Sequence, residues 1–202
     1  MHIINNGTAN MYLTWSDSEE SSHTCLCLRV PLLFYMSMEK TPEYYMGLAL
    51  KEAEKARKID EVPVGAVIVQ DGKIIARAHN LKEKKMQASA HAELLAIQKA
   101  SKKLNNYYLN DCDLYVTLEP CMMCTGAIIL SRVRTLYYGT TDPKGGCTDT
   151  LIQVKTIKHL NHHPNVVSGV RREECAQILT DFFREKRKKT KLLHQEKKRS
   201  EQ

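Results

Sequence analysis

The sequence lacks a long apolar run. No segment of its 202 residues reaches the ~18–20 apolar residues that cross a membrane, and the longest candidate, Leu26 to Met36, is interrupted by Arg29 and Pro31. No lysine or arginine precedes that segment, although a secretory signal peptide carries positive charge there. We therefore expect no membrane association and place the protein in the cytoplasm.

Cysteine is too scarce for a disulfide framework. The chain has seven cysteines, an odd number, and two of them form a C-x-x-C motif at Cys121 and Cys124. Small secreted domains that depend on disulfides are much richer in paired cysteines. The pattern predicts reduced thiols in a cytosolic protein.

Charge is unevenly distributed along the chain. The formal net charge is +7, but residues 184–202 contain nine Lys or Arg against three Glu, so nearly all of the excess lies there. Residues 1–37 are rich in Ser, Asn and Thr and contain one Lys or Arg. We predict a disordered extension or an over-called start over 1–37, with a targeting or regulatory segment as the alternative. One globular domain is expected over 38–183, and a basic helix end and tail over 184–202.

Hydrophobic periodicity and turn residues predict helices alternating with strands. A helix begins with Thr41 as its N-cap and Pro42 in its first turn. The pair Asp71-Gly72 is typical of a hairpin turn. The other predicted elements are strands at 64–70, 73–78, 113–118, 135–138 and 166–170 and helices from 91, at 122–132, at 151–159 and at 173–189. Strands separated by helices indicate a mixed sheet packed between helices.

Two short motifs together indicate zinc chemistry. His91 and Glu93 form H-x-E, and Pro120, Cys121 and Cys124 form P-C-x-x-C. Zinc binds thiolate sulfur and neutral imidazole nitrogen in tetrahedral geometry. Cysteines at i and i+3 share one side of a helix, whose N-terminus favours thiolates. Three ligands leave a fourth position for a water molecule, so the pattern predicts a catalytic site with Glu93 as the proton carrier.

The spacing of H-x-E constrains where these residues lie. His91 and Glu93 are two apart, so they converge only at the very start of a helix, for which Ser89 is the expected N-cap. The alternative is a structural zinc site, which needs a fourth protein ligand. The candidates for that ligand are His79, Cys112 and Cys147.

Five segments follow one another in a distinctive order: EVPVGAVIV (61–69), HN (79–80), HAE (91–93), LYVTLEPCMMC (114–124) and DFFREKR (181–187). From about residue 38 to 189 this order resembles the bacterial tRNA-specific adenosine deaminases of the cytidine deaminase superfamily. H-x-E with P-C-x-x-C alone is common to zinc nucleobase deaminases, whereas the combination of all five segments is typical of far fewer proteins.

This resemblance implies a cytidine deaminase-like three-layer α/β/α sandwich with a mixed sheet of about five strands, and it makes 38–183 a zinc deaminase domain. The implied reaction is hydrolytic conversion of adenosine to inosine at wobble position 34 of a tRNA anticodon, arginine tRNA in the family case. His91, Cys121 and Cys124 match the family's zinc ligands, with one zinc per subunit, and Glu93 matches its proton carrier. Asn80 matches the contact to the flipped base, with a strand-end turn residue as the alternative. The family enzyme is a homodimer.

RNA binding also has support in the sequence itself. Proteins bind single-stranded RNA by stacking bases on aromatic rings and clamping phosphates with cations. Phe182 and Phe183 are followed at once by Arg184, and Lys144 lies in a loop rich in turn residues. We expect one phenylalanine in the core and the other exposed to a base, with Arg184 and Lys144 as backbone contacts.

Two other functions remain open. A deaminase of a free base or nucleoside, of the guanine or cytosine type, would share the zinc site but would not need the basic, aromatic C-terminus. A non-catalytic RNA-binding module stabilised by zinc would not need Glu93. Activity on free nucleosides would favour the first alternative, and an unimpaired Glu93→Ala variant would favour the second.

Overall fold

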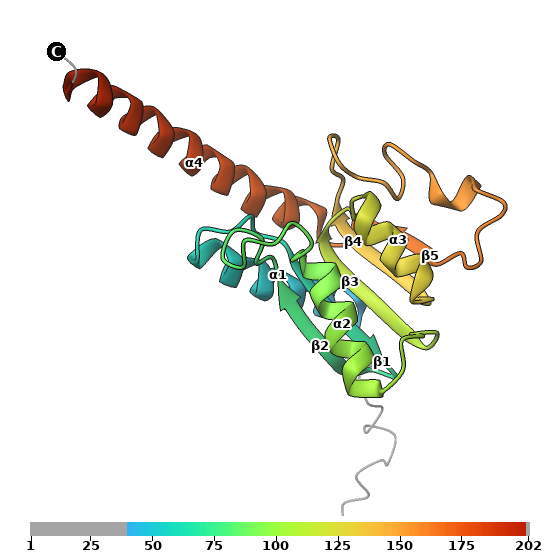
Figure 1. Ribbon diagram of the computed structural model, residues 1–202. Coiled ribbons are helices and arrows are strands. Elements are labelled where there is room, and N and C mark those ends of the chain that lie inside the picture. The colour runs from blue at the N-terminus through green and yellow to red at the C-terminus, as the bar shows by residue number, and fades with distance from the viewer. Residues whose placement is uncertain (1–39, 201–202) are drawn as a thin grey trace, which may run out of the picture. The chain divides into compact units, whose positions relative to one another are not determined.

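The computed structural model describes residues 40–200, and the prediction made for residues 1–37 lies outside this range (Figure 1). In chain order the elements are α1 (Pro42–Lys58), β1 (Gly65–Gln70), β2 (Lys73–His79), α2 (Ala92–Leu104), β3 (Cys112–Leu118), α3 (Met122–Leu130), β4 (Thr135–Thr140), the short 3-10 turn η2 (Val154–Thr156), β5 (Asn165–Ser168) and α4 (Arg172–Ser200).

A five-stranded mixed sheet lies at the centre, in the order β2-β1-β3-β4-β5. β1 pairs antiparallel with β2 and β3, whereas β3–β4 and β4–β5 are parallel. The β1–β2 hairpin turns at Asp71 and Gly72, which both have positive φ, as the sequence predicted. The parallel pair β3–β4 requires a crossover connection, and α3 supplies it.

Different helices cover the two faces of the sheet (Figure 1). Successive side chains of a strand point to opposite faces. Along β1, Ala66 and Ile68 pack with α2 and α3, whereas Val67 and Val69 pack with α1. The three-layer α/β/α sandwich predicted from the sequence is therefore confirmed.

α4 brings the C-terminal residues to the end of the sheet where α3 begins. Its first turn packs on the α1 face, where Cys175 lies so close to Gly139 of β4 that a Cβ at that glycine would clash. Its second turn reaches the other core cluster, in which Leu179 packs near Leu118 at the end of β3. The helix thus passes beside the start of the P-C-x-x-C segment.

Two predictions about helices were wrong. The last helix was expected to end near residue 189, but α4 continues to Ser200, because lysine, arginine and glutamate are good helix formers even without burial. The segment 151–159 forms only the turn η2. Val154 is buried but Leu151 and Ile157 are exposed, so too little apolar surface is buried to stabilise a helix there. Within residues 40–200, no helix is both long and apolar enough to cross a membrane.

Candidate active site

Two helix starts bring the H-x-E and P-C-x-x-C motifs together. His91 is the N-cap of α2, Cys121 is the N-cap of α3, and Cys124 lies in the first turn of α3. The expected N-cap Ser89 is wrong, because the extended residue at the helix start is His91 itself. This placement lets His91 reach past the end of α2 while Glu93 lies within its first turn.

The three ligand atoms have the spacing of a tetrahedral metal site. His91 Nδ1 lies 3.7 Å from Cys121 Sγ and 3.6 Å from Cys124 Sγ, and all three atoms lie within 4.8 Å of one another. For a tetrahedral zinc ion with the usual Zn–N and Zn–S bonds, the N-to-S distance would be about 3.6 Å. The residues therefore fit such an ion.

A fully protein-ligated structural site is not supported by the described residues. The only group of possible metal ligands found among residues 40–200 is His91, Cys121 and Cys124. The candidate fourth ligands His79, Cys112 and Cys147 are not part of it. All five cysteines in this part of the chain are free thiols, in agreement with the prediction of reduced cysteines.

The three groups share protons in a way that suits metal binding. The hydrogen bond from the Cys124 thiol lowers the pKa of Cys121 to about 4. The same bond, together with burial, raises the pKa of Cys124, and hydrogen bonding to Cys121 raises the pKa of His91. A metal ion held by these residues would take the place of the shared protons, and both sulfurs would bind it as thiolates.

Glu93 lies beside this group in a pocket of about 200 Å³. Only 4% of its surface is exposed, and burial raises the pKa of its carboxyl group. The pocket is also lined by His91, Cys121 and Asn80. Two of the three predicted metal ligands, the proton carrier and the base contact therefore line one small cavity, and the third ligand, Cys124, is buried behind it.

Sequence reasoning missed Glu61. In the sequence it stands only as the first residue of EVPVGAVIV (61–69), yet it is 1% exposed and accepts a hydrogen bond from Asn80 Nδ2 at 3.1 Å. Its second oxygen accepts from the backbone N–H of Lys84 at 2.7 Å. The available signal was an acidic residue at the head of the apolar segment EVPVGAVIV, where a charge needs partners.

Glu119 holds the loop that forms one wall of the pocket. Its carboxylate accepts backbone N–H bonds from Asp142, Thr148, Asp149 and Thr150, and also the Thr150 hydroxyl. Burial opposes its ionisation, but these bonds hold the pKa of Glu119 below its ordinary value. These contacts hold the loop against the end of β3, and Asp142 lines the pocket as a result.

Two of the predicted RNA contacts line a neighbouring groove of about 640 Å³, whereas Arg184 does not. This groove shares Val62, Leu118 and Asp142 with the pocket at Glu93. Lys144 and Phe183 both line it. Loop and helix side chains far apart in the sequence thus form one continuous surface with the pocket.

The two phenylalanines behave differently. Phe182 is 4% exposed, whereas Phe183 is 44% exposed. One ring is in the core and the other is on the surface, as expected. Because Phe182 is the buried ring, Phe183 is the ring on which a base could stack. Arg184 is exposed and pairs with Asp181 at 2.5 Å.

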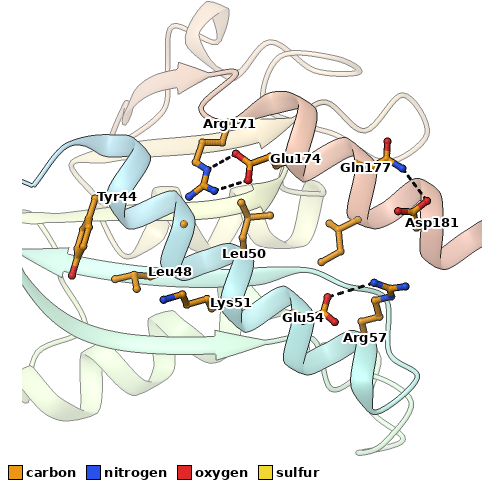
Figure 2. A pocket seen from close by; sticks show the side chains of 12 residues that line it. Tyr44, Leu48, Leu50, Lys51, Glu54, Arg57, Arg171, Glu174, Gln177 and Asp181 are labelled. Atoms are coloured by element: carbon orange, nitrogen blue, oxygen red, sulfur yellow. Dashed lines mark hydrogen bonds and ion pairs between the residues drawn. The ribbon is translucent and has the colours of Figure 1, made fainter.

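A second groove, between α1 and α4, is slightly larger than the groove lined by Lys144 and Phe183 (Figure 2). Its volume is about 660 Å³, and Leu48 and Ile178 contribute apolar surface. Its charges are largely paired with one another, as for Arg171 with Glu174 at 2.5 Å. None of the metal-group residues lines it, so this groove is separate from the candidate active site.

Comparison with known proteins agrees with the geometry of the site. A family model described as MafB19-like deaminase matches residues 41–187. The tRNA-specific adenosine deaminase of Bacillus subtilis is 54% identical over 149 residues, which are 74% of this chain and 92% of that relative. The chain belongs to the tRNA-specific adenosine deaminase family.

Solved structures place this deaminase among enzymes of two kinds. A structure from a study of A-to-I editing by tRNA:A34 deaminases at the wobble position of transfer RNA is 46% identical, covers 67% of this chain and 99% of its own, and has a TM-score of 0.65. A guanine deaminase from Nitrosomonas europaea is 25% identical over 70% of this chain and 84% of its own, with a TM-score of 0.58. The fold is therefore shared by deaminases of tRNA and of a free base.

Proposed function

We propose that this deaminase converts adenosine to inosine at wobble position 34 of a tRNA anticodon, with arginine tRNA as the expected substrate. Water replaces the amino group at C6 of adenine, and ammonia leaves. The observation that carries the proposal is the buried Glu93 next to an open three-ligand group, in a chain 54% identical to a tRNA-specific adenosine deaminase. Such a substrate makes the cytoplasm the expected location.

His91, Cys121 and Cys124 would hold one zinc ion per subunit. When bound, zinc supplies a water molecule whose pKa is lowered to about 7. The three side chains orient the ion because each is anchored at a helix start. The support is the 3.6 and 3.7 Å spacing between His91 Nδ1 and the two sulfurs.

Glu93 carries the proton. Its carboxylate takes a proton from the attacking water and delivers it to the departing amino nitrogen. Burial raises the pKa of Glu93, which makes the carboxylate a better base and its protonated form easier to hold between the two steps. Such a positioned group contributes roughly 10²–10⁴ in rate.

The base would enter the pocket flipped out of the anticodon loop. A volume of about 200 Å³ suits a base but not a helical strand. Asn80 lines this pocket and is the expected hydrogen-bonding contact to the base. Neighbouring nucleotides would then lie in the groove beyond it, with Phe183 as a stacking platform and Lys144 near a phosphate.

The C-terminal helix extends the RNA surface. With 3.6 residues per turn, six of the nine basic residues between 184 and 199 fall within an arc of about 120°. We call these six residues the basic face; they are all exposed: Arg184, Arg187, Lys188, Lys191, Lys198 and Arg199. Because Arg187 also lines the groove next to the pocket, the basic face continues the proposed RNA path.

A homodimer is the expected assembly. The support in this chain is apolar surface on and near α3 that stays exposed in the single chain. Met122 is 64% exposed, Leu130 is 73% exposed and Leu151 is 56% exposed. Burying these side chains against a second copy would be favourable. Sedimentation of the zinc-loaded protein tests this assembly directly.

The function is tested by product analysis. Zinc-loaded protein is incubated with an arginine tRNA that carries A34, and separately with free adenosine, guanine and cytidine. Inosine at position 34 alone is the expected result. Product from guanine alone would instead support the free-base reaction. That alternative is tested because the guanine deaminase of Nitrosomonas europaea has a similar structure.

A further inference from the structure

Glu61 has no part in the metal group, yet it is one of the most buried charged side chains described. It is 1% exposed and lies between α1 and β1. Each of its two oxygens accepts one hydrogen bond: Oε2 from Asn80 Nδ2 at 3.1 Å and Oε1 from the backbone N–H of Lys84 at 2.7 Å. Carboxylates are rarely buried so completely unless their hydrogen bonds are needed.

The bond between Glu61 and Asn80 decides how the side-chain amide of Asn80 is oriented. An ionised carboxylate accepts hydrogen bonds and donates none. Asn80 must therefore turn its NH₂ group toward Glu61, because its carbonyl oxygen would be repelled there. The remaining N–H and Oδ1 form the polar edge of Asn80 in the pocket that it shares with Glu93. A flipped amide would present the opposite pattern of donor and acceptor to a bound base.

The second bond makes the carboxylate itself rigid. The Lys84 N–H fixes one oxygen of Glu61 and also ties the loop after β2 to the same side chain. The Asn80 backbone is held as well, since its N–H donates to the Val64 carbonyl at 3.0 Å. Both the side chain and the main chain of Asn80 are therefore held in place before a base arrives.

We propose that Glu61 is a positioning residue that locks the amide of Asn80 in one orientation and thereby sets the hydrogen-bonding edge offered to the adenine. The proposal rests on the proposed function for the identity of the base. Glu61 touches neither the metal group nor the substrate and acts through Asn80.

The isosteric variant Glu61→Gln separates orientation from packing. Its Oε1 keeps the bond from Lys84 N–H, which leaves its NH₂ group facing Asn80. Two donors then oppose each other until the Asn80 amide flips. We expect kcat/KM for an A34 anticodon stem-loop to fall about ten- to a hundredfold, the scale of one base-reading amide contact, with unchanged zinc content and melting temperature.

A double-mutant cycle distinguishes this from a general structural effect. In an Asn80→Ala background, Glu61→Gln should cause no further loss. The matched control is Glu52→Gln, another buried carboxylate, which bonds His79 Nδ1 at 3.1 Å and not Asn80. Any loss caused by Glu52→Gln should be the same in both backgrounds. An equal loss from Glu61→Gln in both backgrounds, or no loss in either, would overturn the proposal.

A second measurement needs no substrate. The side-chain amide of Asn80 is followed by ¹⁵N NMR in the zinc-loaded protein. Its hydrogens should exchange with solvent roughly tenfold faster in Glu61→Gln, because the flipped NH₂ group loses a charge-assisted bond and faces the pocket. Unchanged exchange would overturn the proposal even if the enzyme proved to act on another base. Absence of inosine with the unmodified protein would contradict the proposed function alone.

Discussion

Charge reversal on the basic face of α4 should weaken RNA binding much more than the same change on the opposite side of the helix. The test variant carries Lys188→Glu and Lys191→Glu, which lie on the basic face. The matched control carries Lys189→Glu and Lys197→Glu, which lie outside it. All four positions are exposed and belong to the same helix. Each variant replaces two lysines by two glutamates, so the two variants have equal net charge.

The expected magnitude follows from counterion release. Each phosphate contact contributes about 0.9 to the slope of log K against log salt for a duplex and about 0.7 for a single strand. Losing the contacts of Lys188 and Lys191 should therefore reduce the slope by about 1.4 to 1.8. The control lysines lie across a helix that is about 10–12 Å wide with its side chains. That exceeds the Debye length of about 8 Å at physiological salt, so screening removes most of their effect.

Fluorescence anisotropy with a labelled anticodon stem-loop provides the assay. The measurement is made over a range of salt concentrations in a Glu93→Ala background, which prevents turnover during the titration. Equal slopes for the test and control variants would show that α4 attracts RNA only through its net charge. Slopes equal to that of the parent in both variants would show that the basic face does not contact RNA.

Three further predictions concern the site and the core. Glu93→Ala should bind zinc and stem-loop normally and yet release no ammonia; residual deamination measured by an ammonia assay would refute its role as proton carrier. Glu119→Gln should flatten the acid limb of a plot of melting temperature against pH. The folded state holds the pKa of Glu119 below 4.5, so the stability from its ionised form is present above that pH and lost as the pH falls through the folded value; an unaltered acid limb would contradict this. Ile128→Ala should cost about 2–5 kcal/mol of unfolding free energy in a denaturant titration, because this side chain is fully buried, whereas Leu193→Ala, at 64% exposed on α4, should change it by less than about 0.5 kcal/mol.

The metal group illustrates how much of a site can be predicted from the sequence. Helix starts are local features, and a cysteine pair at i and i+3 lies on one side of a helix whatever surrounds it. The H-x-E spacing likewise required a helix start, and His91 is the N-cap of α2. The strands could be predicted too, because short apolar runs bounded by turn residues occupy only a few consecutive positions, and β1 is buried along nearly its whole length.

The two buried carboxylates show where such prediction stops. Glu61 bonds Asn80, 19 residues away, and Glu119 bonds a loop 23 to 31 residues away. No periodicity links such positions, since the partners meet only after β1, β2, β3 and β4 have taken their order in the sheet. The end of α4 was also mispredicted, because intrinsic helix propensity continued beyond the last buried residue.

The sequence by itself determined the family, the metal-binding residue types and the alternation of strands and helices, because each depends on short stretches of chain. Only the tertiary structure decided which phenylalanine is buried, which basic residue of α4 lines the groove, and which carboxylate orients Asn80. Those properties depend on the direction of side chains from elements that are distant in the chain, and packing of the sheet between its helices is what sets that direction.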